Sequence, residues 1–355
     1  MKRRIALVFV LLAVALVISL ILTVSIGSVR ISANVAYKIL KANLFSGNMG
    51  SIIESTEWTK SQFHIVWNIR APRVLMGVFA GAGLAVSGAV MQALTLNPIA
   101  DPFILGVSSG GSAGAALALL TTISFFGGYG EVTIMSFLGA SLASLMVYGM
   151  SRLGNSSRIQ PVALLLSGAA VNAVMSAITN ILIFLAKSPE SIAAVYYWQM
   201  GSIASAQWKT LTLPAVAVAG SVLWFSLNGS RFNLLMMGDE DAIALGLNVN
   251  RFRTLMMLTV AFVIGSLVSV TGVIGFIGLM VPHLVRMALG VTDNRVVIPG
   301  CALFGAFYMI WADTGARGLL GATEIPLGII TAFAGAPFFI FLLLRQRMTG
   351  KGDLR

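Results

Sequence analysis

Long apolar runs alternate with short polar segments along most of the chain. About 20 consecutive apolar residues form a helix long enough to cross the hydrocarbon core of a bilayer. Ten runs reach or approach this length, and they predict membrane spans at residues 5–29, 74–96, 102–126, 132–151, 161–186, 210–228, 254–271, 275–290, 297–314 and 326–344. We therefore predict an all-α, polytopic membrane protein in which residues 1–355 form a single transmembrane domain.

Two of the breaks between these runs have recognisable turn chemistry. After the second span, Asp101 is placed to accept from the first free N–H groups of a new helix, and Pro102 suits the first helical position. The chain is therefore expected to turn back at residues 97–101. Between the seventh and eighth spans, Gly272, Gly275 and Gly278 mark a break in an uncharged run that is too long for one span.

The charges between the runs indicate how the chain crosses the membrane. Lys2, Arg3 and Arg4 precede the first span, which favours a cytoplasmic N-terminus, and ten spans then return the C-terminus to the same side. This orientation places 14 of the 23 Lys and Arg residues inside and 9 outside. Residues 30–69 form the longest polar segment and are predicted to contain a short amphipathic helix at the outer surface.

Composition excludes several other classes of protein. Hydrophobic residues make up 57% of the 355 positions and charged residues only 10%, which a soluble domain with one core does not show. The net charge is +11, but the basic residues are spread over short loops, so nucleic-acid binding is not predicted. Cys301 is the only cysteine and lies in an apolar run, so the chain has neither an intrachain disulfide nor a thiolate metal site.

Two blocks of motifs resemble one known family. The first block contains R-x-P-R, G-A-G-L-A-x-S-G, N-P-I-A-D-P and L-G-x-x-S-G-G-x-x-G between residues 70 and 114, and the second contains G-V-I-G-F-I-G-L-M-V-P-H-L-V-R (272–286), D-N-R (293–295), A-D-x-x-x-R (312–317), E-I-P-L-G (324–328) and G-A-P-F-F (335–339). Together they are similar to the FecCD-type permeases, the membrane subunits of ABC importers for iron-siderophores, haem and cobalamin.

This resemblance implies an architecture, partners and a cargo. The fold would be that of a type II ABC importer permease in the cytoplasmic membrane of a prokaryote. A second permease copy, two ATPase subunits that hold ATP and Mg, and an extracytoplasmic substrate-binding protein would complete the machine. The cargo would be an iron-siderophore, haem or cobalamin-type chelate, and family frequency alone favours a ferric siderophore.

Three arginines match family positions that pair with acidic residues of the binding protein. They are Arg70 and Arg73 of R-x-P-R, and Arg317 of A-D-x-x-x-R. Arg70 and Arg73 lie at the start of a predicted span, where the helix macrodipole disfavours cations, so they need a further reason to be there. The alternatives are contacts with lipid headgroups or internal pairs with Asp313 or Glu324.

The predicted inner loop 231–253 resembles the family's ATPase-coupling segment. The pattern L-L-x-x-G…A-x-x-L-G implies two short helices that fit a cleft of the ATPase, with glycines allowing the sharp turns. The apolar contacts would be Leu234, Leu235, Met237, Ala242 and Leu245, and the turns would fall at Gly238 and Gly246. A helix lying on the bilayer surface is the alternative.

Two further groups are assigned through the resemblance. In the fifth span, Asn172, Ser176 and Asn180 share one face at four-residue spacing and would line the translocation path, although hydrogen bonding between helices gives the same pattern. A cytoplasmic gate would comprise Asn97, Ile99, Ser156 and Ser157.

The sequence lacks the motifs of an ATPase, an enzyme or a resident metal site. No G-x-x-x-x-G-K-[ST] loop is present, so ATP hydrolysis is expected on a separate chain. Neither a catalytic constellation nor a Cys/His cluster with metal-ligand spacing occurs, and His283 follows a proline that already explains a kink. The rival classes are an ion-coupled secondary transporter, for which Asp313 is the one candidate coupling residue, and an intramembrane enzyme.

Overall fold

The computed structural model describes residues 2–27, 29–45, 53, 55–121, 130–152, 161–319 and 323–348. Within these ranges the architecture is built from helices, and the one β-type pairing is an isolated bridge between Ser55 and Trp58. Six long apolar helices are α1 (Lys2–Ser25), α6 (Glu131–Ser151), α7 (Pro161–Leu185), α9 (Trp208–Leu227), α12 (Val249–Thr271) and α14 (Asn294–Gly318). A seventh is α4 (Ala71–Thr95), which continues a rod that starts at Lys60.

Three apolar helices are shorter. They are α5 (Val107–Leu120), α13 (Ile277–Leu289) and α15 (Leu327–Met348), whose apolar part ends at Leu342. In the described part of the chain, the seven long helices are by length and composition able to cross a membrane. Each of the ten predicted spans overlaps one of these ten helices.

The hinge after α4 follows the predicted chemistry but divides the next helix. Leu96 ends α4 in the left-handed conformation, with φ 53°. The Asp101 side chain accepts a hydrogen bond from Phe103 N at 2.8 Å and starts a 3₁₀ turn, η2 (Pro102–Leu105). Gly106, with φ 76°, separates this turn from α5, so the expected single helix over 102–126 is wrong.

The break between α12 and α13 also differs in part from the expectation. Gly272, with φ 64°, ends α12, and Phe276 precedes α13 in the left-handed conformation. Gly278 lies inside α13 rather than in the turn. A Cβ at Gly278 would meet Pro102 Cδ at 2.8 Å and Leu84 O at 3.1 Å, and a Cβ at Gly88 of α4 would approach Gly278 O to 1.9 Å, so Gly278 serves close helix packing and not the break.

The helical rod that contains α4 is longer than the core of a bilayer. It comprises α3 (Lys60–Phe63), the π-helix η1 (His64–Arg70) and α4, 36 residues in all. At about 1.5 Å per residue it is roughly 50 Å long, against roughly 30 Å for the hydrocarbon core. The segment around Arg70 and Arg73 is therefore near one end of the molecule.

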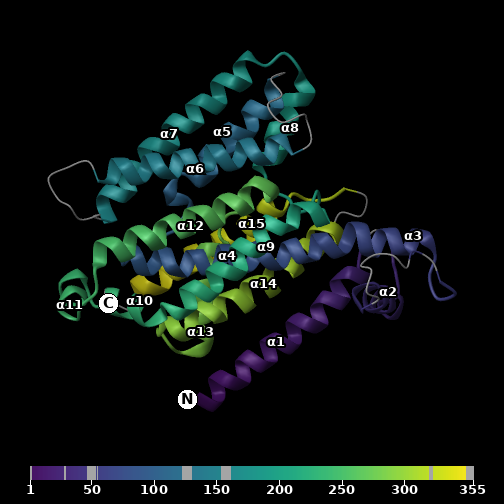
Figure 1. Cartoon of the computed structure of the whole chain (residues 1–355), viewed down its shortest axis with the longest axis horizontal. Helices are drawn as coiled ribbons and strands as arrows, with labels where there is room; N and C mark the ends of the chain where they lie inside the picture. Colours follow the sequence, from purple (N-terminus) through teal and green to yellow (C-terminus); the bar gives the residue numbers. More distant parts are fainter. Residues whose placement is uncertain are drawn as a thin grey trace.

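Helix α4 lies at the centre of the bundle, surrounded by α9, α12, α13 and α14 (Figure 1). Small residues make this possible, because they allow helix backbones to approach closely where no hydrophobic effect drives association. A Cβ at Gly81 would come within 2.1 Å of Gly305 O on α14. Beside this group, α5, α6 and α7 form a second layer, with α7 on the outside (Figure 1).

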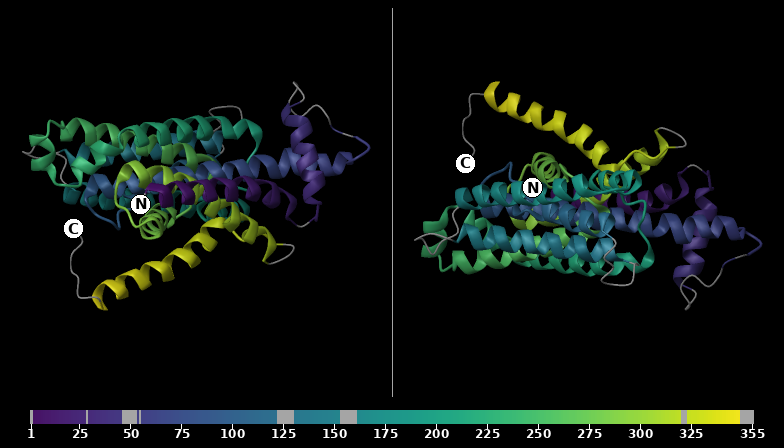
Figure 2. Two further views of the ribbon diagram at one scale, coloured as in Figure 1. Left: turned by 90° about the horizontal axis from the view of Figure 1, so that it is seen from below. Right: turned by 90° about the horizontal axis from the view of Figure 1, so that it is seen from above.

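Helices α1 and α15 flank the bundle. Figure 2 shows α15 diverging from the other helices, and its Phe333 side chain is 83% exposed. Helix α1 packs along α14, and Trp311 Nε1 donates to Ser19 Oγ at 3.0 Å between them. The outward faces of α1, α7 and α15 carry exposed apolar side chains, including Val10, Leu11, Leu166, Phe184 and Ile340.

Short helices mark the two ends of the bundle. At one end, which we call the α2 end, lie α2 (Ala33–Phe45) and α8 (Pro189–Gln199) (Figures 1 and 2). At the other, the α11 end, lie α10 (Gly229–Leu235) and α11 (Asp239–Ala244). Helix α2 forms within the polar segment that was predicted to contain a surface helix. Helix α1 begins at the α11 end, and α15 runs toward it.

Candidate functional site

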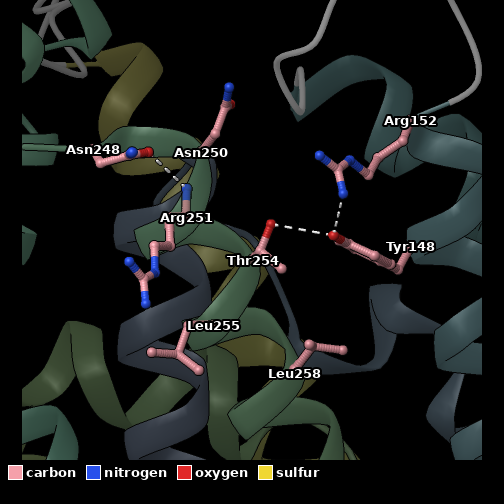
Figure 3. A pocket seen from close by; sticks show the side chains of 8 residues that line it. All are labelled: Tyr148, Arg152, Asn248, Asn250, Arg251, Thr254, Leu255 and Leu258. Carbon is pink, nitrogen blue, oxygen red and sulfur yellow. Dashed lines mark hydrogen bonds between the residues drawn. The ribbon is translucent and has the colours of Figure 1, made fainter.

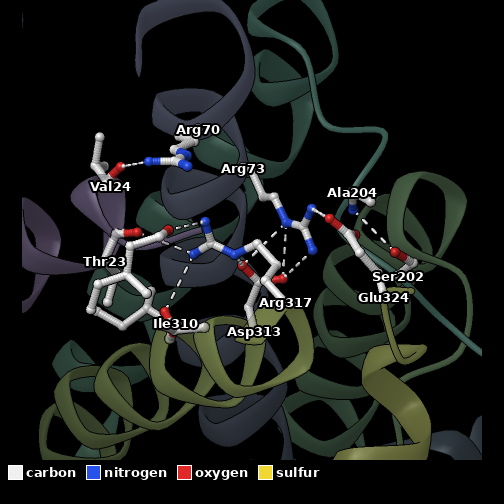
Figure 4. A network of polar contacts seen from close by, with 12 residues as sticks. Thr23, Val24, Arg70, Arg73, Ser202, Ala204, Ile310, Asp313, Arg317 and Glu324 are labelled. Atoms are coloured by element: carbon white, nitrogen blue, oxygen red, sulfur yellow. Dashed lines mark hydrogen bonds and ion pairs between the residues drawn. The ribbon is translucent and has the colours of Figure 1, made fainter. Parts of the chain in front are cut away.

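The three arginines predicted to dock a binding protein are buried together at the α2 end (Figure 4). Arg70 and Arg73 are 5% exposed and Arg317 is 6% exposed. They come from the start of the central rod and the end of α14, with Asp313 also on α14 and Glu324 just before α15. We refer to these five side chains as the arginine cluster.

Arg73 holds the two carboxylates of the cluster. Its Nε and Nη2 donate to Asp313 Oδ1 at 3.0 and 2.9 Å, and its Nη1 donates to Glu324 Oε2 at 2.9 Å. Asp313 is 1% exposed, and its Oδ2 also lies 3.0 Å from Arg317 Nε. The Glu324 side chain, in contrast, is 49% exposed.

Arg70 and Arg317 bind the last turn of α1 and the residues that follow it. Arg70 Nη1 donates to Val24 O and Ser25 O at 3.0 and 2.9 Å. Arg317 donates to Thr23 O at 3.2 Å and to Ile26 O at 3.0 Å. Carbonyls at a helix C-terminus have no intrahelical partner and carry the negative end of the macrodipole, which favours cations. This explains why Arg70 sits against the dipole of its own helix.

These contacts show how the three predicted docking arginines are placed in the chain itself. In this structure their guanidinium groups are internally paired, as in the alternative considered from the sequence, and are not presented to a partner. Their role in docking a binding protein stays a prediction. Glu324 is the member of the cluster that a partner at the α2 end could reach.

The α11 end carries the segment predicted to couple to an ATPase. It forms two short helices, α10 and α11, as the family pattern implied, and the turns fall at Gly238 with φ 116° and Gly246 with φ 88°. Both values lie in the left-handed region that favours glycine. The chain leaves the membrane-length helix α9, makes these two turns and enters α12.

Polar contacts hold this segment against the bundle. Arg253, buried in α12, donates to Asp239 Oδ1 and Oδ2 at 2.9 and 3.0 Å and to Leu94 O, near the end of α4, at 3.0 Å. Asn233 on α10 accepts from Asn294 N at 2.8 Å. The position of α10 and α11 is thus set by the ends of α4, α12 and α14.

The apolar residues that are exposed on this segment differ in part from those predicted. Leu235 and Ala242 are fully buried and Leu234 is half-buried, so Leu235 and Ala242 are not the exposed contacts that were predicted. They pack inward because α10 and α11 each need one apolar face against the bundle. The exposed apolar side chains, which we call the coupling patch, are Met236, Met237, Ile243 and Leu245, and the sequence reading had missed Met236 and Ile243.

The polar face of α7 divides into two parts. Asn172 is half-buried and its Oδ1 accepts from Ser109 Oγ of α5 at 2.5 Å, which is the packing contact considered as an alternative to a path residue. Ser176 and Asn180 are exposed. Of the three predicted path residues, these two are exposed and Asn172 is half-buried.

Two of the four predicted gate residues are described by the structure. Asn97 Oδ1 accepts from Ile99 N at 3.1 Å and shapes the turn after α4, and the Ile99 side chain is 48% exposed. Ser156 and Ser157 lie outside the described residues. The turn after α4 therefore carries two exposed apolar side chains, Leu96 and Ile99, and the gating role stays a prediction.

Asp101, in the same turn, has an unusual titration. Burial raises its pKa to about 6, while the hydrogen bond from Phe103 N acts in the opposite direction. Because the folded pKa exceeds the unfolded value of about 3.9, ionisation destabilises the fold fully above pH 6 and not at all below pH 4. Asp101→Asn retains an acceptor for the cap, and we expect it to raise the free energy of unfolding by about 1–2 kcal/mol at pH 8.

The measurement is chemical unfolding of the purified chain between pH 4 and pH 8. The gain should disappear near pH 4, where the wild-type carboxyl group is neutral. Asp239→Asn is the control, because it removes a carboxylate that pairs with buried Arg253 and should lower stability at pH 8. A gain for Asp101→Asn that is the same at both pH values would contradict the assignment.

His283 and the acidic residues do not gather into a metal site in the described residues. No group of three or more His, Cys, Asp or Glu side chains in that part of the chain has the arrangement of a metal site. The His283 ring packs edge-on against Phe338 of α15, with ring centroids 6.0 Å apart. This contact joins α13 to α15.

The fold and these sites define a helical membrane protein of transport type. A model of the FecCD transport family matches residues 14–345, and the chain belongs to this family. It is 39% identical over 318 residues to the hemin transport system permease protein HmuU of Yersinia pestis, covering 87% of this chain and 93% of that one. It is 36% identical over 308 residues to the vitamin B12 import system permease protein BtuC of Serratia proteamaculans, covering 86% and 90%.

A solved structure has the same fold. It is described as an inward-facing conformation of a metal-chelate type ABC transporter, and it matches with a TM-score of 0.77 at 28% identity. The match covers 94% of this chain and 97% of that chain. The predicted all-α fold of an ABC importer permease and the family resemblance are thus confirmed.

Proposed function

We propose that the chain is the permease subunit of a binding-protein-dependent ABC importer in the cytoplasmic membrane of a prokaryote. The observation that carries this proposal is the coupling patch, an exposed apolar surface on two short helices that the bundle holds in place. Met237 and Leu245 are 61% and 59% exposed. Exposed apolar groups that are rigidly placed on a polar end of a membrane protein suit a partner interface.

The partner at this patch is an ATPase subunit that binds ATP and Mg. The chain itself contains no nucleotide-binding loop, so the energy for transport comes from elsewhere. Because Arg253 links α11 to the end of α4, a displacement of the patch acts directly on the central helix of the bundle. This connection supports coupling between ATP hydrolysis and the transport path.

The proposed orientation places the α11 end in the cytoplasm. Helix α1 begins at that end and α15 runs toward it, so both termini are cytoplasmic. The larger number of Lys and Arg residues on that side agrees with this orientation. The α2 end then faces the extracytoplasmic binding protein, and the half-exposed Glu324 lies within its reach.

A second copy of the chain completes the path. The outward faces of α7 and α15 are apolar over much of their length and carry Ser176 and Asn180 on α7. Apolar faces with a few polar groups suit the wall of a path between two copies better than they suit contact with lipid alone. We therefore place the cargo between α7 helices of a homodimer.

The cargo is a metal chelate of the haem or cobalamin type. This rests on the relatives, whose names specify hemin and vitamin B12, while the motif resemblance also extends to ferric siderophores. A stand-alone secondary transporter has no support, because its one candidate coupling residue, Asp313, is occupied by Arg73 and Arg317. A panel of chelates tested against the cognate binding protein would identify the cargo.

Leu245→Asp tests the proposal directly. The variant places a charge in the coupling patch, where a docked ATPase would bury it without a partner, so we expect ATPase affinity to fall at least tenfold and uptake to be lost. The measurement is co-purification of the ATPase and uptake in vesicles.

Asn248→Asp is the matched control, because it adds the same charge at an exposed position outside the patch and keeps the cap that starts α12. It should leave co-purification within twofold of wild type. If both variants retained the ATPase equally, the patch would not be its docking surface.

A further inference from the structure

A polar pocket opens between α6 and α12 at the α11 end (Figure 3). Its volume is about 470 Å³, within the range of small-molecule sites. Tyr148 and Arg152 form the α6 wall, and Thr254, Leu255 and Leu258 are among the residues of the α12 wall. Nothing in the coupling or transport roles above uses this pocket.

The pocket carries positive charge and no negative charge. Arg152 and Arg251 are both exposed and both line it, and none of the lining residues is acidic. Among the described residues, neither guanidinium forms an ion pair. The eight residues after Arg152, 153–160, contain no Asp or Glu either. The two arginines therefore have free capacity for an anion.

The α6 wall positions one of these arginines. Arg152 Nη1 donates to the Tyr148 hydroxyl at 2.7 Å, and its guanidinium lies 5.4 Å from the centre of the Tyr148 ring. The Tyr148 hydroxyl is 3.4 Å from Thr254 Oγ1 across the pocket (Figure 3). Neutral partners orient the guanidinium without neutralising it, which preserves its affinity for a phosphate.

An apolar stripe continues from the pocket along both helices. On α12, Arg251, Leu255, Leu258 and Phe262 follow at intervals of four, three and four residues, so they share one face. On α6, the corresponding exposed residues are Leu145, Leu142 and Leu138. The rings of Phe137 and Phe262 meet edge to face at 5.9 Å, which joins the two helices along the stripe.

The length of the stripe indicates what covers it. Eleven residues separate Arg251 from Phe262, about 16 Å of helix, which is close to half the thickness of a bilayer core. A soluble partner cannot follow a surface to that depth, whereas a lipid chain does. A cationic pocket above an apolar stripe matches a phospholipid with an anionic headgroup.

We propose that this site binds one anionic phospholipid per chain, with its headgroup at the pocket that Arg152 and Arg251 line and an acyl chain along the stripe. The orientation proposed above places it in the cytoplasmic leaflet, whose anionic lipids attract clusters of Lys and Arg. The site itself does not depend on transport activity. It would remain if the cargo or the ATPase assignment were wrong.

The test is native mass spectrometry of the purified full chain with phosphatidylglycerol or phosphatidylcholine of identical acyl chains. Wild type should retain one phosphatidylglycerol and prefer it clearly to phosphatidylcholine. Arg152→Gln with Arg251→Gln should weaken phosphatidylglycerol binding about twentyfold and leave phosphatidylcholine binding unchanged, because each arginine near a membrane surface contributes about a fivefold effect. Replacing both arginines with Lys should preserve most of the preference for phosphatidylglycerol. That result would show that the site tolerates substitution when the positive charge is kept.

Arg231→Gln is the matched control, since Arg231 is an exposed cation of the same end that donates to a neutral partner, Asn228, and lies outside the pocket. It should bind phosphatidylglycerol as wild type does. Equal retention of the two lipids by wild type, or equal losses in the control and the double variant, would overturn the proposal. Competition by soluble glycerol phosphate at concentrations comparable to the lipid would assign the pocket to a free phosphate and would also overturn it.

Discussion

Replacing Asp313 with Asn is expected to lower the free energy of unfolding by about 3–5 kcal/mol. Asp313 is 1% exposed, and it lies between Arg73 and Arg317. The arginine cluster contains three cations and two carboxylates, so loss of Asp313 leaves Glu324 as the one carboxylate for three buried guanidinium groups. Removing one partner of a buried ion pair exposes the full desolvation cost of the other.

The measurement is chemical or thermal unfolding of the purified chain, with Glu324→Gln as the matched control. Glu324 pairs with the same Arg73, but its side chain is 49% exposed, and solvent weakens an ion pair of this kind. Its loss should cost no more than about 1 kcal/mol. Equal effects of the two variants would show that Asp313 is not the carboxylate that stabilises the cluster.

The arginine cluster also shows what the sequence could not reveal. The arginines were correctly identified as unusual, because Arg70 and Arg73 lie at an unfavourable end of a helix. Pairing with Asp313 or Glu324 was one of the alternatives considered from the sequence, but the carbonyl partners were not: 46 positions separate Arg70 from Val24. Every residue has a backbone carbonyl, so residue identity does not show which carbonyl accepts a hydrogen bond, and the contacts to α1 could not be predicted.

The same type of contact recurs at the opposite end of the molecule. Arg253 donates to Leu94 O at the end of α4, as Arg70 and Arg317 donate to carbonyls at the end of α1. In each case a buried guanidinium donates to carbonyl groups at a helix end, which have no partner within the helix and cannot rely on water inside a membrane protein. Few charges occur in this chain, and these three stabilise helix termini and the contacts between helices.

The helices themselves were largely predictable, for a physical reason. A membrane span needs a long apolar run, and such runs are visible without knowledge of tertiary contacts. The turn at Asp101 and the two glycine turns around α11 were also predictable, because capping and left-handed backbone depend on local residues. Which apolar face of α10 and α11 is buried was not, since Leu235 and Met237 have similar hydrophobicity and only packing distinguishes them.

Glycine positions show the same limit within the bundle. Gly272 ends α12 as expected, but Gly278, six residues later, serves helix packing instead. Both have the same sequence context, a run of apolar and glycine residues. The difference appears only when α4 is placed against α13.

The close approach of α4 and α13 leads to the second large effect. Gly88→Ala is expected to lower the free energy of unfolding by about 3 kcal/mol, the upper part of the range for overpacked cores. The added methyl group would lie 1.9 Å from Gly278 O and 2.4 Å from Gly278 C and Cα. All three atoms belong to the backbone, so no side chain can rotate away, and the two helices must separate.

Gly220→Ala on α9 is the control, because a Cβ there meets nothing within 4 Å and alanine favours a helix over glycine by about 0.5–1 kcal/mol. Unfolding of both purified variants should therefore show changes of opposite sign. If Gly88→Ala were as stable as Gly220→Ala, the spacing between α4 and α13 would not be set by glycine contact, and the role assigned to Gly278 would be wrong as well.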